Sequence, residues 1–115
     1  MHELLISGIE CYAFHGCLNE EELIGCNYTI DILFSADLTN AVATDNLSQT
    51  IDYVLVNEIV KKEMGASSKL IEHVAGRIHK SLIREFPVCS KIKVSVAKHQ
   101  PPVHGYIHRA VFSIS

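Results

Sequence analysis

A lysine near the end of the chain is the residue with the clearest chemical potential. Lys98 lies three residues before the first of two prolines and has the same parity as an alternating apolar series. The members of that series are Ile92, Val94 and Val96. A lysine on an apolar face is partly desolvated, which disfavours the ammonium form and suits proton transfer or Schiff-base chemistry. The structural alternative, which the pattern alone favours, is that the stem packs on the core while the head reaches water.

Carboxylates occur at two places where a functional role and a structural role compete. Glu20, Glu21 and Glu22 form an acidic run in a polar loop expected over residues 15–25. Such a run is usually a solvated loop, although functional carboxylates also favour loops held by a rigid scaffold, and the pattern does not choose among the three. Glu72 falls in the first turn of an expected helix, where the helix dipole already explains a carboxylate. It could also pair with the amino-amidine edge of a heterocycle.

Tyr53 opens an expected helix directly after Asp52. Tyrosines at helical spacing usually pack, but a hydroxyl that faces a pocket can donate a proton. No H-x-H, H-E-x-x-H or clustered Cys/His motif is present, and the sequence therefore predicts no metal site. It also contains no Gly-rich phosphate loop.

The composition predicts a self-associating protein. The 115 residues are 48% hydrophobic and the mean hydropathy is +0.19, which is high for a small monomer. Ten Lys and Arg against thirteen Asp and Glu give a net charge of -3 without a basic stripe, which argues against a nucleic-acid partner. Four scattered cysteines, with no secretory leader and no apolar run long enough for a membrane span, indicate reduced thiols in a cytoplasmic protein.

The periodicity of apolar residues changes twice along the chain. It predicts strands over residues 4–14, 28–35, 91–98 and 106–114, and helices over residues 53–64 and 71–82. Gly8 in the first strand suggests a bulge, and Gly65 fits a helix stop. The order ββααββ favours an α+β class in one domain of residues 1–115: a four-stranded antiparallel sheet with two helices on one face. The other face of the sheet would need a partner.

Six short segments then occur in an order that is specific as a set. They are Tyr12-Ala13-Phe14-His15-Gly16, Glu20-Glu21 with Ile24-Gly25, Thr44-Asp45-Asn46, Ile51-Asp52-Tyr53, Leu70-Ile71-Glu72-His73-Val74-Ala75, and Lys98 with Pro101-Pro102. Together they resemble the dihydroneopterin aldolase family of the folate pathway over nearly the whole chain. The resemblance implies the tunnelling fold, in which antiparallel sheets of several subunits join into a barrel with helices outside. It also implies a homo-octamer of stacked tetrameric rings, with active sites between neighbouring subunits.

The resemblance also implies roles for individual residues. By match to the family motifs, Glu72 would anchor the amino-pyrimidine edge of a pterin, and main-chain groups near Ile51, Asp52 and Ile71 would complete that recognition. Lys98 resembles the catalytic lysine of the family and Tyr53 its catalytic tyrosine. Glu21 resembles the loop carboxylate that helps to position substrate and water. Tyr53 and Lys98 need not come from the same subunit.

The implied reaction converts 7,8-dihydroneopterin into 6-hydroxymethyl-7,8-dihydropterin and glycolaldehyde, without a cofactor, metal or Schiff base, because the dihydropterin C=N unit can accept the electrons. A 2′-epimerase side activity is expected from the same chemistry. The first alternative is an epimerase of dihydroneopterin or its triphosphate, for which only His108 and Arg109 offer nearby positive charge. The second alternative is a non-catalytic ring that binds a pterin or a purine.

Overall fold

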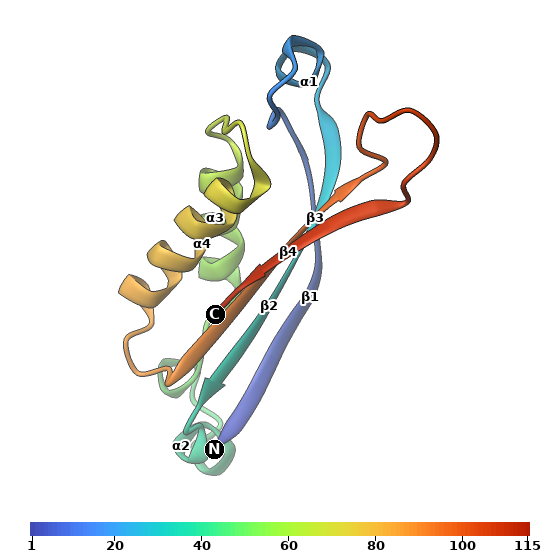
Figure 1. The fold of residues 1–115 in the computed structure, drawn as a ribbon. Helices are drawn as coiled ribbons and strands as arrows, with labels where there is room; N and C mark the ends of the chain where they lie inside the picture. Colours follow the sequence, from blue (N-terminus) through green and yellow to red (C-terminus); the bar gives the residue numbers. More distant parts are fainter.

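Four antiparallel strands form the centre of the fold. A computed structural model describes residues 1–115, and its sheet has the order β1 (His2–Ala13), β2 (Cys26–Ala36), β3 (Lys91–His99) and β4 (Arg109–Ile114). Each strand pairs with its neighbour in sequence order, and the strands run side by side in a long twisted sheet (Figure 1). The four predicted strands and their antiparallel arrangement are confirmed, although β4 begins at Arg109 and not at Tyr106.

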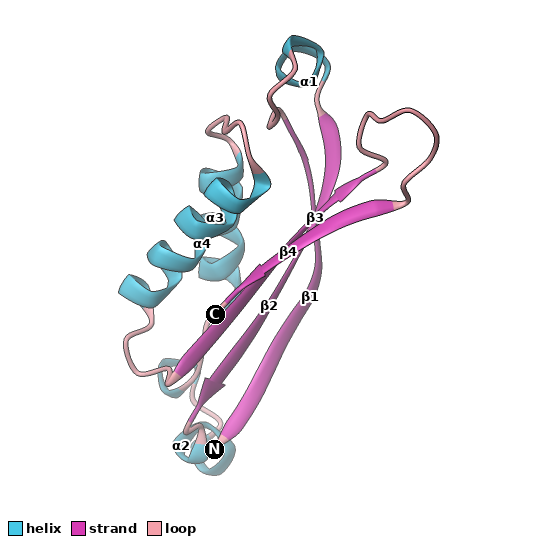
Figure 2. Cartoon of the chain, viewed as in Figure 1, coloured by secondary structure: helices cyan, strands magenta, loops and turns pink.

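Two helices cover one face of this sheet. They are α3 (Tyr53–Met64) and α4 (Ile71–Glu85); α4 contacts β3 and β4, and α3 contacts β1 (Figure 2). The core lies between the two layers, where every second residue of β2 is fully buried. These residues are Tyr28, Ile30, Ile32 and Phe34. The α+β class, the helical layer on one face and the helix end at Gly65 agree with the sequence prediction.

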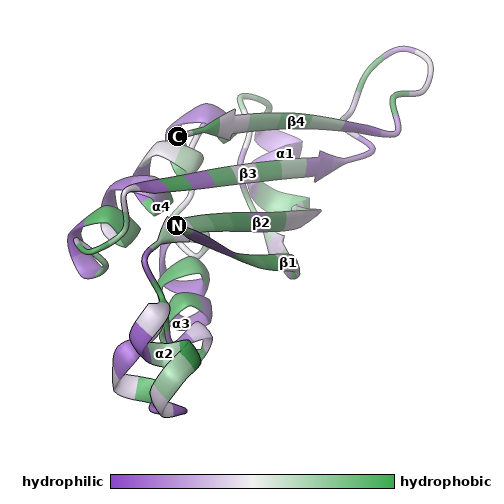
Figure 3. Ribbon diagram, turned by 90° about the horizontal axis from the view of Figure 1, so that it is seen from below, coloured by the Kyte–Doolittle hydropathy of each residue, from purple (hydrophilic) through white to green (hydrophobic).

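The opposite face of the sheet carries no helix. Hydrophilic and hydrophobic positions alternate along β3, and the four strands lie in a row with the helices on one side only (Figure 3). Leu5 of β1 and Val111 of β4 are more than half exposed. Because β1 and β4 each pair with one neighbour only, both edges of the sheet are open.

Gly8 interrupts the regular pairing of β1 with β2. The register shifts between Ile6 and Ile9, and Gly8 has a φ of 77°, which favours glycine. Its amide donates to Asp31 Oδ1 at 2.7 Å. The predicted bulge is confirmed. It switches the inward-facing positions of β1 from even to odd numbers, so that Ile9, Cys11 and Ala13 face the core in the second half of the strand.

The predicted polar loop over residues 15–25 is wrong in part, because it contains the short helix α1 (Asn19–Ile24). The first turn of α1 consists of acidic residues, which interact favourably with the amino end of a helix. The structure also has a short helix α2 (Thr39–Thr44) and a 3-10 turn, η1 (Leu47–Gln49), between β2 and α3. The longest helix has 15 residues, and no helix of the chain is both long and apolar enough to cross a membrane.

Candidate active site

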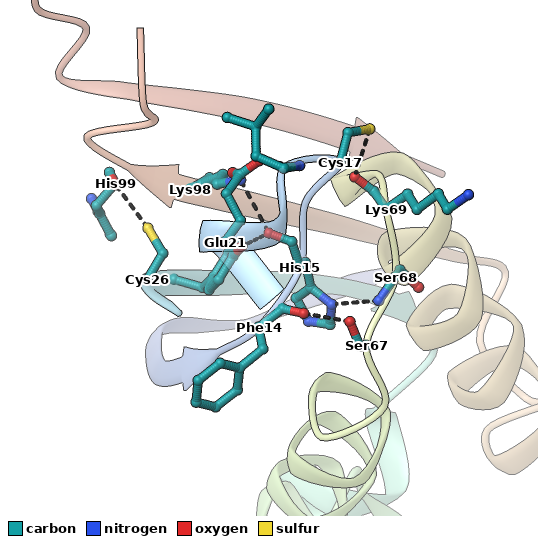
Figure 4. Close-up of polar contacts among 12 residues, drawn as sticks. Phe14, His15, Cys17, Glu21, Cys26, Ser67, Ser68, Lys69, Lys98 and His99 are labelled. Carbon is teal, nitrogen blue, oxygen red and sulfur yellow. Dashed lines mark hydrogen bonds and ion pairs between the residues drawn. The ribbon is translucent and has the colours of Figure 1, made fainter. Parts of the chain in front are cut away.

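Lys98 lies on the buried face of β3, as its parity predicts. It pairs with Tyr28 of β2, and only 8% of the residue is exposed. Its Nζ donates to Glu21 Oε2 and to the main-chain oxygen of His15 at 3.1 Å (Figure 4). The ammonium group therefore does not extend into water, and the structural alternative for Lys98 is wrong.

Glu21 is the member of the acidic run that reaches Lys98. It lies in α1, and its side chain is only 12% exposed, whereas Glu20 and Glu22 are exposed residues. Its other oxygen, Oε1, accepts the amide of Leu18 at 3.3 Å. Gly16 makes room for this carboxyl group, because a Cβ at position 16 would overlap the Glu21 side chain. The residue pattern did not separate the three carboxylates, whereas the family resemblance pointed to Glu21, and Glu21 is the one that contacts Lys98.

Burial and pairing have opposite effects on the stability of the charged forms of Lys98 and Glu21. Removing either charge from water is unfavourable, and the opposite charge within direct contact offsets that cost for both. The lysine is therefore one half of a nearly buried ion pair, where the sequence suggested an unpaired desolvated amine. Such a pair can pass a proton when a bound substrate changes the local charge.

His15 occupies the space between this ion pair and the loop that precedes α4. Its ring is 1% exposed, and its Nδ1 accepts the amide of Ser68 at 2.9 Å. Burial, with the nearby positive charges of Arg77 and Lys98, lowers the pKa of His15 to about 4. The ring is therefore neutral near pH 7, which the acceptor role of Nδ1 requires. The sequence places His15 within the Tyr12-Ala13-Phe14-His15-Gly16 motif but indicates no role for it.

Tyr28 supports the same segment from the sheet. Its hydroxyl donates to the main-chain oxygen of His15 at 2.9 Å, and the two rings meet edge to face. Burial raises the pKa of the Tyr28 phenol well above its ordinary value, so this group remains a donor. The His15 carbonyl thus accepts from both Tyr28 and Lys98.

Ile71 and Glu72 begin α4 only a few residues after Ser68. Glu72 is an exposed residue in the first turn of α4. An open groove of about 310 Å³ borders this helix start, and it is lined by Ser67, Ser68, Lys69, Leu70 and His73. Glu72 and the Lys98–Glu21 pair therefore lie at the same end of the molecule, joined through Ser68 and His15.

The predicted residues Ile51, Asp52 and Tyr53 lie elsewhere in the chain. Asp52 caps α3 by accepting the Val54 amide at 2.9 Å, Ile51 is buried, and Tyr53 is 65% exposed. They stand at the amino end of α3, whose 12 residues span ~18 Å. The carboxyl end of α3 leads into the Ser68 loop, so one helix length separates the two groups (Figure 1). The chain does not bring Tyr53 to its own Lys98.

A second set of contacts fixes the Ser68 loop from the helical layer. Arg77 of α4 donates to the main-chain oxygen of Ala66 at 2.7 Å and to Ser68 Oγ at 2.9 Å. It also forms an ion pair with Glu63 at 3.0 Å. Nothing in the sequence pattern indicated this clamp, because its partners are loop atoms. No group of three or more His, Cys, Asp or Glu side chains is arranged to hold a metal ion.

The comparisons of this sequence with known proteins agree on one family. A family model described as dihydroneopterin aldolase matches residues 4–115. The dihydroneopterin aldolase of Streptococcus pyogenes serotype M3 is 35% identical over 107 residues, which cover 92% of this chain and 90% of that relative. The structure of E. coli dihydroneopterin aldolase in complex with neopterin has a TM-score of 0.86 at 18% identity and covers 100% of both chains. A Burkholderia dihydroneopterin aldolase bound to guanine has a TM-score of 0.76 at 19% identity, over 98% of this chain and 88% of that one.

The two structural neighbours share the fold of this chain, including the four-stranded sheet with its helical layer. Family membership rests on the sequence matches, because they extend over nearly all of the residues that form the sheet, the ion pair and the start of α4. On that match, the chain belongs to the dihydroneopterin aldolase family.

Proposed function

We propose that this chain performs the retro-aldol cleavage of 7,8-dihydroneopterin with Lys98 and Glu21 as its proton-handling pair. The observation that carries the proposal is the nearly buried contact between these two side chains, at the same end of the molecule as Glu72. Family membership makes the chain an aldolase, that is, a carbon–carbon lyase of folate biosynthesis. The buried pair supplies the acid–base chemistry that such a reaction needs.

The reaction requires four proton transfers around one bond cleavage: one at the 2′-hydroxyl, two at the ring nitrogen and one at C1′. Removal of the 2′-hydroxyl proton releases glycolaldehyde as the C1′–C2′ bond breaks. The bonding electrons form a double bond between C1′ and the ring carbon, and the C=N electrons move onto the ring nitrogen, which takes up a proton. The resulting enol-like intermediate is then protonated at C1′ while the ring nitrogen releases its proton, which restores the C=N unit. Lys98, acting through water, would manage the transfers near the side chain, and Tyr53 would help to protonate the intermediate. Glu21 keeps the ammonium of Lys98 in place.

Glu72 would bind the amino-pyrimidine edge of the pterin. Glu72 is exposed in the first turn of α4, so a ligand can reach its carboxylate. The main-chain groups of Ile71, Ile51 and Asp52 would complete the recognition. The neighbour bound to guanine is consistent with this assignment, because guanine presents the same amino-amidine edge. A carboxylate can accept two parallel hydrogen bonds from such an edge.

Tyr53 would enter the site from a neighbouring subunit. Within one chain it stands a helix length away from the loop that contacts His15, on an exposed position. An assembly in which β4 of one copy meets β1 of the next would close both open edges of the sheet into a barrel. Rings of four subunits, stacked in pairs as an octamer, are the arrangement we propose.

Incubation of the purified protein with 7,8-dihydroneopterin, without added metal, tests the proposal. We expect 6-hydroxymethyl-7,8-dihydropterin and glycolaldehyde as products, and loss of turnover in Lys98→Ala with neopterin binding retained. Lys93→Ala is the matched control, because Lys93 is an exposed lysine of the same strand. Formation of the 2′-epimer alone would favour the epimerase alternative, and binding without turnover would favour the non-catalytic ring. Equal losses of turnover and binding in Lys98→Ala would refute the role of Lys98.

A further inference from the structure

We infer that His15 is a positioning residue. Its ring, through Ser68, fixes the position of Glu72, the proposed pterin-binding carboxylate, relative to the Lys98–Glu21 pair. The inference deepens the proposed function and rests on it. It concerns a buried side chain that would touch no reacting atom. The main chain and the ring of His15 contact different parts of the site.

The main chain of His15 contacts Lys98, one member of the proposed catalytic pair. Its carbonyl oxygen accepts Lys98 Nζ at 3.1 Å and the Tyr28 hydroxyl at 2.9 Å. The next residue, Gly16, is the position that leaves space for the Glu21 carboxyl group. A shift of this segment would therefore displace both members of the pair together.

The ring of His15 contacts Ser68, in the loop that precedes α4. Its Nδ1 accepts the amide of Ser68 at 2.9 Å, and the Gly16 amide donates to the Ser68 oxygen at 2.8 Å. Ser68 lies four residues before Glu72, at the start of α4. Figure 4 shows the ring pointing from the Lys98 side of the segment toward Ser68. The Gly16 amide contact remains whatever residue occupies position 15, and so do the contacts of Ser67 Oγ with the Phe14 oxygen and of Cys17 Sγ with the Lys69 oxygen. A substitution at position 15 therefore removes the contact of the ring alone.

Only one nitrogen of the ring carries this function. Nδ1 accepts from Ser68, whereas Nε2 is buried and makes no hydrogen bond of ordinary geometry. The main chain of Met64 also acts on the ring, and its effect raises the pKa of His15 against the larger effect of burial. The neutral state that Nδ1 needs is favoured by burial and by the positive charges of Arg77 and Lys98 that face the ring.

Replacing His15 by Asn or by Gln distinguishes a positioning role of the ring from a role in packing alone, because the two side-chain amides differ in length. In His15→Asn the side-chain oxygen can take the place of Nδ1, whereas in His15→Gln the amide falls at the place of Nε2. We expect His15→Gln to lower kcat by about 10–100-fold, as a small misplacement of reacting groups does, with neopterin affinity changed by less than about threefold. His15→Asn should keep kcat within about fivefold of the parent protein. His15→Leu, which has no acceptor, should behave as His15→Gln.

The measurements are kcat and KM for 7,8-dihydroneopterin, the Kd of neopterin, and the Ser68 amide exchange rate in each assembled variant. Faster Ser68 exchange and lower kcat in His15→Gln, with both restored in His15→Asn, would support the inference. Equal kcat in His15→Asn and His15→Gln would overturn it. Should His15→Leu not fold, the Asn and Gln pair decides alone. Absence of cleavage by the parent protein would refute the proposed function, whereas normal cleavage by the parent and by His15→Gln refutes only the inference.

Discussion

The energetic coupling between Lys98 and Glu21 gives the sharpest test of the site. Their side chains are only 10% and 12% exposed, so removing one partner leaves the other charge largely desolvated. Breaking such a buried pair typically costs about 3–5 kcal/mol of folding free energy. Because both groups keep slight contact with water, we expect the low end of that range, about 3 kcal/mol, for Glu21→Leu and for Lys98→Met.

The double variant should behave differently from the sum of the single ones. Replacing a buried ion pair by apolar residues of similar volume is often neutral or stabilising. The His15 carbonyl would keep the Tyr28 hydroxyl as a donor at 2.9 Å, so no buried acceptor is left unpaired. We therefore expect Glu21→Leu/Lys98→Met to lie within about 2 kcal/mol of the parent protein, against about 6 for the sum of the single changes.

Urea denaturation at pH 7 and a fixed protomer concentration measures these free energies, because association contributes to the stability of an oligomer. The resulting coupling energy should be about 4 kcal/mol or more. Additive single and double effects would refute the contact. A double variant that was stable yet retained turnover would refute the catalytic role of the pair.

Three further predictions concern binding, assembly and pH. Glu72→Ala should raise the Kd of neopterin by at least about tenfold while kcat falls less, measured by titration and steady-state kinetics; an unchanged Kd, equal to that of the Glu85→Ala control, would contradict the anchor role. Inactive Tyr53→Phe and Lys98→Ala subunits, unfolded and refolded together in equal amounts, should recover about one quarter of the activity if each site draws these residues from two subunits, and none if one chain supplies both. Because the pKa of His15 is lowered from 6.5 to about 4, the unfolded state binds more protons in this window, so stability should fall as pH decreases from 6.5 toward 4. His15→Asn should lose that component of the slope in acid denaturation, and an identical slope would contradict it.

The sheet and its two main helices were predictable because their apolar residues repeat at the strand or helix period over many positions. Buried and less buried residues alternate strictly along β2, and this pattern is typical of a strand with one covered face. The helix α1 was missed because six residues are too few for a periodic signal, and its formation depends on the Glu21 carboxylate and the space at Gly16. The start of β4 was placed too early, because residues 106–108 are apolar or aromatic but lie outside the ladder.

Part of the candidate site was likewise predictable from the sequence, and part was not. The parity of Lys98 placed it on the buried face of its strand, and the resemblance supplied Glu21, Glu72 and Tyr53 as candidates. The contact of Lys98 with Glu21 required the three-dimensional path of the segment after β1, because 77 residues separate them in the chain. The role inferred for His15 was invisible to pattern, because its partners are a main-chain amide and a carbonyl that every residue possesses.

The sequence by itself determined which segments become strands and helices, since this depends on local periodicity, and it determined the family, since motif order is a property of the chain. The tertiary structure decided which of three adjacent carboxylates faces the lysine, that the lysine is paired, and that Tyr53 lies a helix length from the site of its own chain. The physical reason is that hydrogen bonds and ion pairs act over a few ångströms in space between residues that are distant in sequence. No spacing along the chain encodes those distances until the sheet and the helices have packed together.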